Sequence, residues 1–337
     1  MTLAHTADRA ADRAADRAVG AVLGTACGDA VGAGYEYGSA TPGAGPVSMI
    51  GGGLGGFAPG EWTDDTSMAI PILQAVARGA HLAQDATQDE IVRQWAEWAT
   101  TAPDVGNQTR AVLTGIGPTA REARIASMVF HHDHRRSAGN GSLMRTAPVA
   151  LAFVADDAPG RVAAAARALS DLTHFEADAG DACVIWSVAI WAAIRTGALS
   201  LDEGIGCLPA ERQTLWRERF ADAEGNAPAH FAAQNGWVVA AAQEAWSCIH
   251  AQRAALGGGN VTAGFAAVCE AAIRAGGDTD TVAAIAGGLA GAAVGAGALP
   301  AVWVEMLHGW PGITGGQLAG LAQQALAHRQ PAMPRTP

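Results

Sequence analysis

A long uncharged stretch near the C-terminal end places the strongest constraint on how this chain folds. Residues 282–304 contain no Asp, Glu, Lys or Arg. Gly287, Gly291 and Gly295 recur there at every fourth position, a spacing that lets a neighbouring helix approach closely. The stretch is long enough to cross a membrane, but its many Gly and Ala residues make it only weakly hydrophobic. Because it follows directly on an acidic loop, we expect it to form a buried central helix of a soluble bundle.

Composition and periodicity extend this helical expectation to the rest of the chain. Hydrophobic residues make up 50% of the sequence but aromatic residues only 6%, and small side chains favour closely packed helices over a sheet sandwich. Helical periodicity recurs in residues 90–100, 161–170, 179–195, 238–254 and 261–275. No repeat of solenoid length and no linker divides the chain. The sequence therefore predicts an all-α fold with a single compact domain over residues 18–328.

The two ends of the chain differ from this domain. Residues 7–18 repeat the string Ala-Asp-Arg-Ala, so we expect residues 1–17 to form a charged, solvated helical extension, with a partner-binding arm as the alternative. The proline-rich residues 329–337 are predicted to be a disordered tail.

Charge and cysteine usage exclude several classes of function. The formal net charge is −11 and lysine is absent, so a nucleic-acid backbone is not expected as the main partner. The five cysteines are scattered without a Cys-x-x-Cys spacing, which indicates neither a disulfide framework nor a zinc cluster. No secretory signal is visible at the N-terminus. We therefore expect a cytoplasmic protein without a membrane partner.

Two acidic signatures far apart in the sequence carry the most specific chemistry. The first is Trp62-Thr63-Asp64-Asp65-Thr66, and the second is Gly276-Gly277-Asp278-Thr279-Asp280-Thr281. Both precede apolar helical runs, so one such loop by itself is explained by helix capping. Capping needs a single side chain, however, and closely spaced carboxylates repel one another unless a cation compensates them. Carboxylate and hydroxyl oxygens suit hard divalent cations, and the two loops together favour a metal site.

Short strings in a fixed order resemble the ADP-ribosylglycohydrolase family, the type that includes the dinitrogenase reductase-activating glycohydrolase and the ADP-ribosyl-acceptor hydrolases. The strings, which extend over residues 18–300, are Gly28-Asp29-Ala30-Val31-Gly32 with Tyr35-Glu36, Gly60-Glu61-Trp62-Thr63-Asp64-Asp65-Thr66, Gly139-Asn140-Gly141-Ser142-Leu143-Met144-Arg145, Leu172-Thr173-His174, Gly236-Trp237-Val238-Val239, and Gly276 through Thr281. Each string is a weak signal alone, but their shared order makes chance resemblance improbable. The resemblance implies an all-helical fold with a cleft that holds two divalent cations, Mg²⁺ or Mn²⁺.

The resemblance also assigns roles to individual residues of this chain. It implies that the metal ligands are Thr63, Asp64, Asp65, Asp278, Asp280 and Thr281. The candidate catalytic residues are Glu36, which the family places as a gate near the scissile bond, and Asp65.

The candidate substrate-binding residues are Asp29, Asn140, Gly141, Ser142, His174 and Trp237. The glycine-rich loop at 139–142 opens an apolar helical stretch, so its backbone N–H groups are suited to a diphosphate. Each of the other positions has a simpler explanation. Asp29 is equally suited to a helix cap, His174 to a packing position and Trp237 to the core.

A further polar segment, residues 131–136, reads His-His-Asp-His-Arg-Arg. Contiguous side chains do not converge easily on one ion, so we expect a solvated loop rather than a zinc site. Its arginines are candidates for holding an incoming phosphate.

These observations favour a metal-dependent hydrolase that cleaves the glycosidic bond between ADP-ribose and its acceptor. Arginine-linked ADP-ribose is the first expectation, on a modified protein or a small-molecule conjugate, while serine, a base or a metabolite remain open as acceptors. A nucleic acid enters only as a modified substrate. The alternatives are a non-catalytic ADP-ribose-binding or structural protein and a di-metal phosphohydrolase acting on a nucleotide diphosphate.

Overall fold

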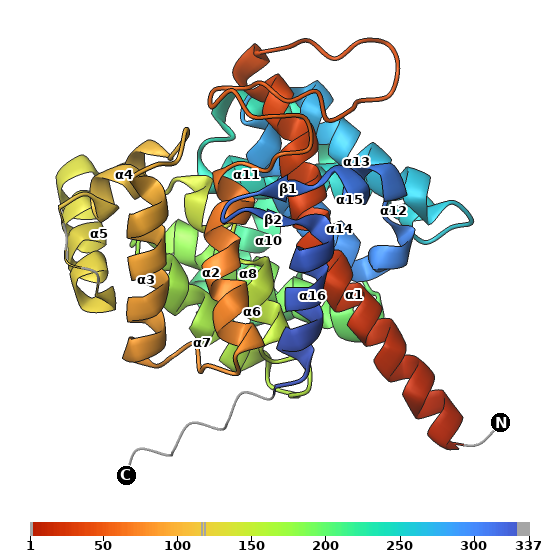
Figure 1. Cartoon of the computed structure of the whole chain (residues 1–337), viewed down its shortest axis with the longest axis horizontal. Helices are drawn as coiled ribbons and strands as arrows, with labels where there is room; N and C mark the ends of the chain where they lie inside the picture. Colours follow the sequence, from red (N-terminus) through yellow and green to blue (C-terminus); the bar gives the residue numbers. More distant parts are fainter. Residues whose placement is uncertain (1–2, 116, 118, 329–337) are drawn as a thin grey trace.

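The structure is a computed structural model that describes residues 3–115, 117 and 119–328, and it is built almost entirely from helices (Figure 1). The α-helices are α1 (Leu3–Gly32), α2 (Asp64–Ala77), α3 (Asp85–Ala99), α4 (Asn107–Leu113), α5 (Ala120–His134), α6 (Ala147–Leu151), α7 (Pro159–Ser170), α8 (Ala177–Thr196), α9 (Asp202–Gly206), α10 (Ala210–Gly225), α11 (Val238–Ala251), α12 (Arg253–Leu256), α13 (Val261–Ala275), α14 (Thr279–Val294), α15 (Ala301–Met306) and α16 (Gly315–Leu326). Short 3-10 helices are η1 (Ala33–Gly38), η2 (Asn140–Ser142), η3 (Pro228–His230), η4 (Ala232–Gln234) and η5 (Ala296–Ala298). Two short strands, β1 (His308–Gly309) and β2 (Ile313–Thr314), pair in an antiparallel hairpin. The predicted all-α fold is confirmed.

Helices α1 and α14 form the centre of the bundle and lie unusually close together. A Cβ atom added at Gly24 would lie 2.3 Å from the carbonyl oxygen of Gly287, and one added at Gly20 would lie 2.4 Å from that of Gly291. The two backbones therefore touch along a stripe of small residues. The glycine spacing in residues 282–304 predicted such a contact, and its partner proves to be the glycines that recur at four-residue spacing in α1. The packing sets the end of α1 beside the start of α14, where a Cβ atom at Gly32 would lie 2.4 Å from the Cα atom of Asp280.

Two predicted helices end earlier than the periodicity indicated. The helix expected over residues 282–304 ends at Val294, because Gly295 takes a φ of 89°, which interrupts helical geometry and which glycine adopts without strain. The helix expected over residues 238–254 ends at Ala251, and α12 follows after a break at Gln252. By contrast, α13 matches its predicted bounds, since it runs over Val261–Ala275.

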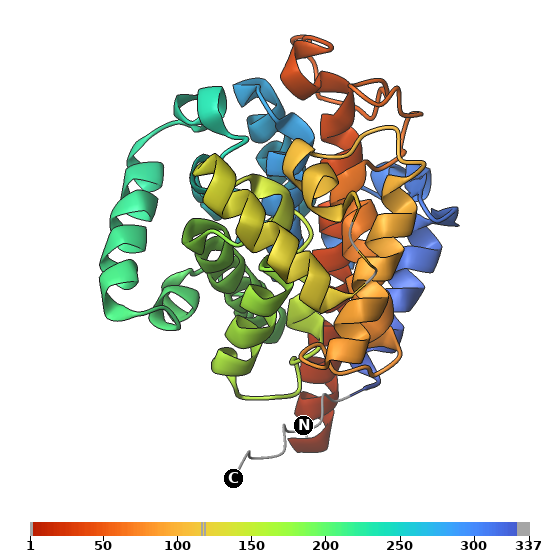
Figure 2. The ribbon, with the colours of Figure 1, turned by 90° about the vertical axis from the view of Figure 1, so that its left-hand side faces the viewer.

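Around the central pair, large side chains fill the spaces between helices and pair their polar atoms. The indole N–H of Trp95 donates to the carbonyl oxygen of Met68 at 2.8 Å, and that of Trp186 donates to Ile285 at 2.9 Å. Both rings are almost completely buried, so these hydrogen bonds fix α3 to α2 and α8 to α14. Seen from the side, α5 crosses the front of the bundle and α10 covers its left edge (Figure 2).

Helix α8 has the length and composition of a membrane-spanning helix, although 83% of its most apolar window is buried inside this fold. Helix α14, which carries most of the uncharged stretch, is shorter, and its side chains are buried between Thr279 and Ala292. The apolar side chains of both helices thus pack in the protein core.

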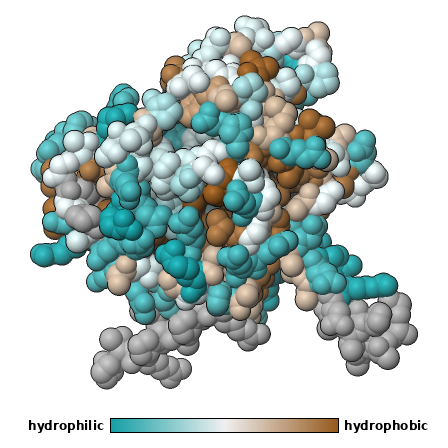
Figure 3. Space-filling model, viewed as in Figure 1, coloured by the Kyte–Doolittle hydropathy of each residue, from teal (hydrophilic) through white to brown (hydrophobic). Residues whose placement is uncertain are grey.

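Helix α1 runs without interruption through the predicted boundary at residue 17. Ala18 and the residues after it are buried, whereas Arg13 and Asp16 are exposed. The helix projects from the body of the molecule there (Figure 1), and Figure 3 shows hydrophilic residues where it leaves the body. The separate N-terminal extension stays a prediction, and the predicted tail at 329–337 lies outside the described residues.

Candidate active site

The structure brings the two acidic loops together at one end of the central helix pair. Asp64 and Asp65 begin α2, while Asp278 and Asp280 surround the start of α14. Carboxylate oxygens of Asp29, Asp65 and Asp280 all lie within 4.8 Å of one another. A second group is formed by Glu36, Asp278 and Asp280 at the same spacing. Asp280 therefore belongs to both groups and joins the two loops.

Asp29, at the end of α1, fixes the first loop in place. Its carboxylate accepts hydrogen bonds from the backbone N–H groups of Thr63 at 2.8 Å and Thr66 at 3.0 Å. The side chain is completely buried. Asp29 therefore caps the N-terminus of α2 from a different helix, as the simpler explanation of this residue expected. It also lies within the acidic cluster.

Asn235 and Asn140 fix the second loop through a network that the sequence did not indicate. The side-chain oxygen of Asn235 accepts from the backbone N–H of Asp278 at 2.9 Å, and its amide group donates to the carboxylate of Glu244 at 3.0 Å. The amide group of Asn140 donates to the Asp278 carboxylate at 2.6 Å and to the carbonyl oxygen of Asn235 at 2.9 Å. No sequence motif marks the role of Asn235 and Glu244, because this role depends on elements that meet only in the folded chain.

Glu36 reaches the cluster because η1 is tied to the second acidic loop. The backbone N–H of Tyr37 donates to the carbonyl oxygen of Gly277 at 2.8 Å, and the hydroxyl of Thr279 donates to that of Gly32 at 2.9 Å. The Glu36 side chain is buried. Burial first, and then the negative charges of Asp278, Asp104 and Asp64, raise its pKa to about 8.

The whole cluster carries more negative charge than its surroundings compensate. Burial is the main cause that raises the pKa of Asp29 to about 6 and that of Asp64 to about 7, and it raises the pKa values of Asp65 and Asp280 well above their usual range. Among the residues that the structure describes, no Arg or His side chain forms an ion pair with these carboxylates.

One buried oxygen of the cluster points to what would compensate this charge. Oδ1 of Asp65 is buried and has no hydrogen-bond partner within the described part of the chain. Leaving a buried polar atom unpaired costs about 1–3 kcal/mol, and the cost is higher when the group is charged. An oxygen-rich, anionic cluster with an unpaired oxygen fits a hard divalent cation.

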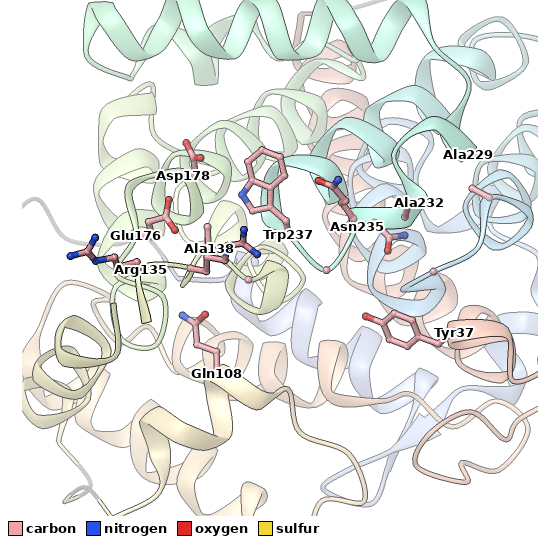
Figure 4. A pocket seen from close by; sticks show the side chains of 17 residues that line it. Tyr37, Gln108, Arg135, Ala138, Glu176, Asp178, Ala229, Ala232, Asn235 and Trp237 are labelled. Atoms are coloured by element: carbon pink, nitrogen blue, oxygen red, sulfur yellow. The ribbon is translucent and has the colours of Figure 1, made fainter. Parts of the chain in front are cut away.

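A cavity of about 1300 Å³ opens beside the second acidic loop (Figure 4). Tyr37 and Gly277 line it next to the cluster, and Arg135 and Arg136 line it farther away. The ring of Trp237, which is 40% exposed, forms part of the wall, and the guanidinium of Arg219 lies 5.8 Å from its centre. The position of Trp237 thus matches an exposed aromatic wall and not a core position.

The predicted substrate loop lies at the edge of this cavity, but its residues face different surroundings. Gly139 lines the cavity, whereas Ser142 is buried and its hydroxyl accepts a hydrogen bond from Ser170 at 2.9 Å. The backbone N–H of Asn140 donates to the carbonyl oxygen of Gly236 at 3.2 Å, so this group is already paired. The diphosphate role of the Asn140–Gly141–Ser142 backbone stays a prediction, and the observed contacts support a structural part for Ser142.

His174 lies beneath the same loop. A Cβ atom added at Gly141 would lie 3.1 Å from its ring, and its Nδ1 lies 2.7 Å from the hydroxyl of Thr173. Burial lowers the pKa of His174 well below its usual range, so the ring is neutral at pH 7. The side chain therefore supports the loop from behind, and its contact with substrate stays a prediction.

The polar segment 131–136 is not the loop that we expected. Residues 131–134 form the last turn of α5, and Arg135 ends the helix with a φ of 54°. The Nδ1 atom of His134 lies 3.0 Å from the carbonyl oxygen of Phe130, one turn earlier in the helix. Helical geometry distributes the histidines around the helix, while the two arginines after it line the large cavity.

The fold and the site define an all-helical protein with a buried carboxylate centre suited to divalent cations beside a large polar cavity. Comparison with known proteins gives the family. A profile described as ADP-ribosylglycohydrolase matches residues 10–335, and the chain belongs to this family of enzymes.

Individual relatives agree with this assignment. The chain is 30% identical over 262 residues to the ADP-ribosyl-[dinitrogen reductase] glycohydrolase of Rhodospirillum rubrum, covering 77% of this chain and 78% of that protein. It is 30% identical over 268 residues to the ADP-ribosylarginine hydrolase Tri1 of Pseudomonas putida, covering 76% of this chain but 65% of that protein. The match to the Tri1 hydrolase of Serratia proteamaculans is 29% identical and covers 28% of that protein. A solved structure titled "ADP-ribosylglycohydrolase-related protein complex" has a TM-score of 0.71 at 27% identity, covering 94% of this chain and 99% of its own.

Proposed function

We propose that this protein hydrolyses the N-glycosidic bond between ADP-ribose and an arginine side chain, with two divalent cations, Mg²⁺ or Mn²⁺, in the carboxylate centre. The observation that carries the proposal is the pair of three-carboxylate groups that share Asp280. A carboxylate shared between two groups suits a pair of neighbouring cations, because its two oxygens can serve both.

The residues that would hold the cations come from both loops. Asp65 and Asp280 would contribute to the first site, and Asp278 with Asp280 to the second. Thr63, Asp64 and Thr281 complete the ligand set that the family pattern implies. When bound, such cations orient ribose hydroxyls and polarise a water molecule.

The large cavity suits the ADP-ribose part of the substrate. Its exposed tryptophan, Trp237, offers a flat apolar face for adenine. Arg135 and Arg136 line the same cavity and supply positive charge for the diphosphate. The opposite end of ADP-ribose, its anomeric carbon, would then reach Glu36 and the carboxylate centre past Tyr37.

Glu36 is the residue to which we assign proton transfer. Its position beside Asp278 and Asp280 supports this role, and a pKa raised to about 8 by burial favours proton exchange near neutral pH. Water oxygen bonds to the anomeric carbon while the carbon–nitrogen bond breaks. Glu36, in its carboxylate form, accepts a proton from the water and passes it to the departing guanidino nitrogen, so the products are ADP-ribose and arginine and Glu36 is restored.

Arginine is favoured as the acceptor because the P. putida relative is named an ADP-ribosylarginine hydrolase. The R. rubrum relative is named for an ADP-ribosylated protein, dinitrogen reductase, so a modified protein is the favoured substrate, with a small ADP-ribose conjugate as the alternative. The cysteines are all free thiols, four of them buried, which agrees with the reducing cytoplasm that we propose as its location.

A product assay tests this function. Protein stripped of metal with EDTA is incubated with peptides ADP-ribosylated on arginine or serine, with and without Mg²⁺ or Mn²⁺. We expect metal-dependent release of intact ADP-ribose from the arginine peptide. We expect Asp280→Asn to lose both this activity and cation binding, measured by calorimetry. The matched control is Asp157→Asn, which removes the same charge from a side chain that is 89% exposed.

Other outcomes of these assays would contradict the proposal, and two of them would identify a different function. Release of AMP with ribose phosphate would identify a phosphohydrolase acting on the diphosphate. Binding of ADP-ribose without any product would identify a non-catalytic member of the family. An Asp280→Asn variant that keeps full activity would exclude the shared-carboxylate centre.

A further inference from the structure

A second cavity, of about 500 Å³, adjoins the first acidic loop on a different side from the large cavity. Thr63 and Asp64 form the wall next to the carboxylate centre. The connection between α3 and α4, with Asp104, forms another wall, and the β1–β2 hairpin with Trp310 forms a third. Figure 1 shows this hairpin lying across the upper end of α2. We call this space the acceptor pocket and define it by Phe57, Trp98, Asp104, Trp310, Glu61 and Asp64.

The hairpin wall is held to the acidic loop by direct hydrogen bonds. The backbone N–H of Trp62 donates to the carbonyl oxygen of His308 at 3.0 Å, and that of His308 donates to Gly60 at 3.1 Å. The indole N–H of Trp62 also donates to the carbonyl oxygen of Trp310 at 3.2 Å. The pocket is therefore a built feature of the fold, with its walls fixed relative to the carboxylate centre.

Charge distinguishes the acceptor pocket from the large cavity. Three carboxylates line the pocket, of which Asp64 is also a proposed cation ligand, and no Arg is among its lining residues in the described part of the chain. Glu61 is partly satisfied, because the backbone N–H of Ala58 donates to its carboxylate at 2.8 Å. Asp104 lies close enough to the centre to raise the pKa of Asp64 and Glu36. The large cavity carries Arg135 and Arg136 together with Glu176 and Asp178, and Asp178 is already paired with Arg212 and Arg219. Of the two spaces, the large cavity is therefore the one that offers guanidinium groups to an anionic substrate group.

Aromatic side chains line the acceptor pocket beside its carboxylates, and this combination suits a flat cation. Phe57, Trp98 and Trp310 all contribute to its lining. A guanidinium group is planar and weakly hydrated, stacks on aromatic faces and pairs with a carboxylate through parallel hydrogen bonds. An ammonium group or a neutral hydroxyl meets only part of this environment.

We propose that the acceptor pocket binds the guanidinium group and side-chain carbons of the ADP-ribosylated arginine while the large cavity binds ADP-ribose. The inference rests on the proposed function and assigns its acceptor specificity to Asp104 and the ring of Trp310. The substrate then lies with its anionic diphosphate near Arg135 and Arg136 and its cationic acceptor near Asp104. Its scissile bond lies between them, at the carboxylate centre.

Two variants separate the charge from the aromatic face. Asp104→Asn keeps the shape of the side chain and removes its charge, and Trp310→Leu removes the ring but keeps an apolar contact. At saturating Mn²⁺ we expect each to raise KM for an arginine-linked peptide about tenfold, with a smaller change in kcat. Asp157→Asn again serves as the matched charge control and should leave KM unchanged.

A binding measurement tests the pocket without turnover. Calorimetry on the Mn²⁺-loaded protein compares N-acetyl-arginine amide with N-acetyl-citrulline amide, which has the same shape but no charge. We expect the wild-type protein to bind the arginine compound at least tenfold more tightly, and Asp104→Asn to reduce this preference to within twofold. Equal binding of both compounds by the wild-type protein would overturn the proposal.

The outcomes also separate this proposal from the proposed function. Turnover of the arginine peptide with wild-type KM in both variants would overturn the acceptor pocket and leave the hydrolase standing. Absence of turnover on every ADP-ribose conjugate, together with an arginine preference that depends on Asp104, would reject the hydrolase and support the pocket.

Discussion

The contact between α1 and α14 yields a quantitative prediction for Gly24→Ala. The added Cβ atom would lie 2.3 Å from the carbonyl oxygen of Gly287, whereas ordinary contacts begin at 3.4 Å, so the two helices must separate by about 1 Å. Both sides of the contact are backbone and no side chain can turn away. We therefore expect a cost near the upper end of the overpacking range, about 3 kcal/mol of the free energy of unfolding.

The matched control is Gly320→Ala in α16. Gly320 lies inside a helix, a Cβ atom there meets nothing within 4 Å, and its φ is not positive. Replacing a mid-helix glycine by alanine in open space should stabilise the protein by about 0.5–1 kcal/mol. The two variants therefore make the same chemical change with opposite expected signs.

Urea denaturation followed by tryptophan fluorescence measures both effects. With a slope of about 3 kcal/mol/M, the midpoint should fall by about 1 M for Gly24→Ala and rise slightly for Gly320→Ala. Cation binding should weaken as well in Gly24→Ala, because the contact sets Asp29 of α1 beside Asp280 of α14. A Gly24→Ala midpoint equal to that of the wild-type protein would refute the claim that these backbones touch.

Two further predictions concern buried carboxylates. Burial raises the pKa of Glu244 to about 8 from an ordinary value of 4.5. As pH rises, the Glu244 carboxyl group therefore loses its proton in the unfolded chain before it does so in the folded protein. The wild-type protein should lose stability as pH rises from 4.5 to 8. In Glu244→Gln, the loss of unfolding free energy over this pH range should be smaller than in the wild-type protein by about 2–4 kcal/mol. An unchanged pH profile would contradict the raised pKa. Asp65→Asn removes the negative charge of the buried carboxylate that carries the unpaired oxygen. We therefore expect a higher thermal midpoint in EDTA and a smaller rise on adding Mn²⁺ than in the wild-type protein. Equal Mn²⁺-induced shifts in the two proteins would remove Asp65 from the cation site.

The helical class and the two acidic loops were predictable from the sequence alone. Glycine at four-residue spacing in residues 282–304 implied a close helix partner, because only glycine leaves room for backbone contact. The clustering of Asp64 with Asp65 and of Asp278 with Asp280 implied a cation, because adjacent carboxylates repel one another without one. Both arguments are local, so they could be made from short segments of chain.

Which elements meet at that centre depends on the packing of the whole chain. Asn235 and Glu244 fix the second loop through side chains that are remote from it in sequence, and no local pattern marks them. The acceptor pocket likewise joins Asp104 to Trp310, residues from opposite parts of the chain. Long-range packing brings such groups together, and a single sequence records propensity and periodicity along the chain without recording the distances across it.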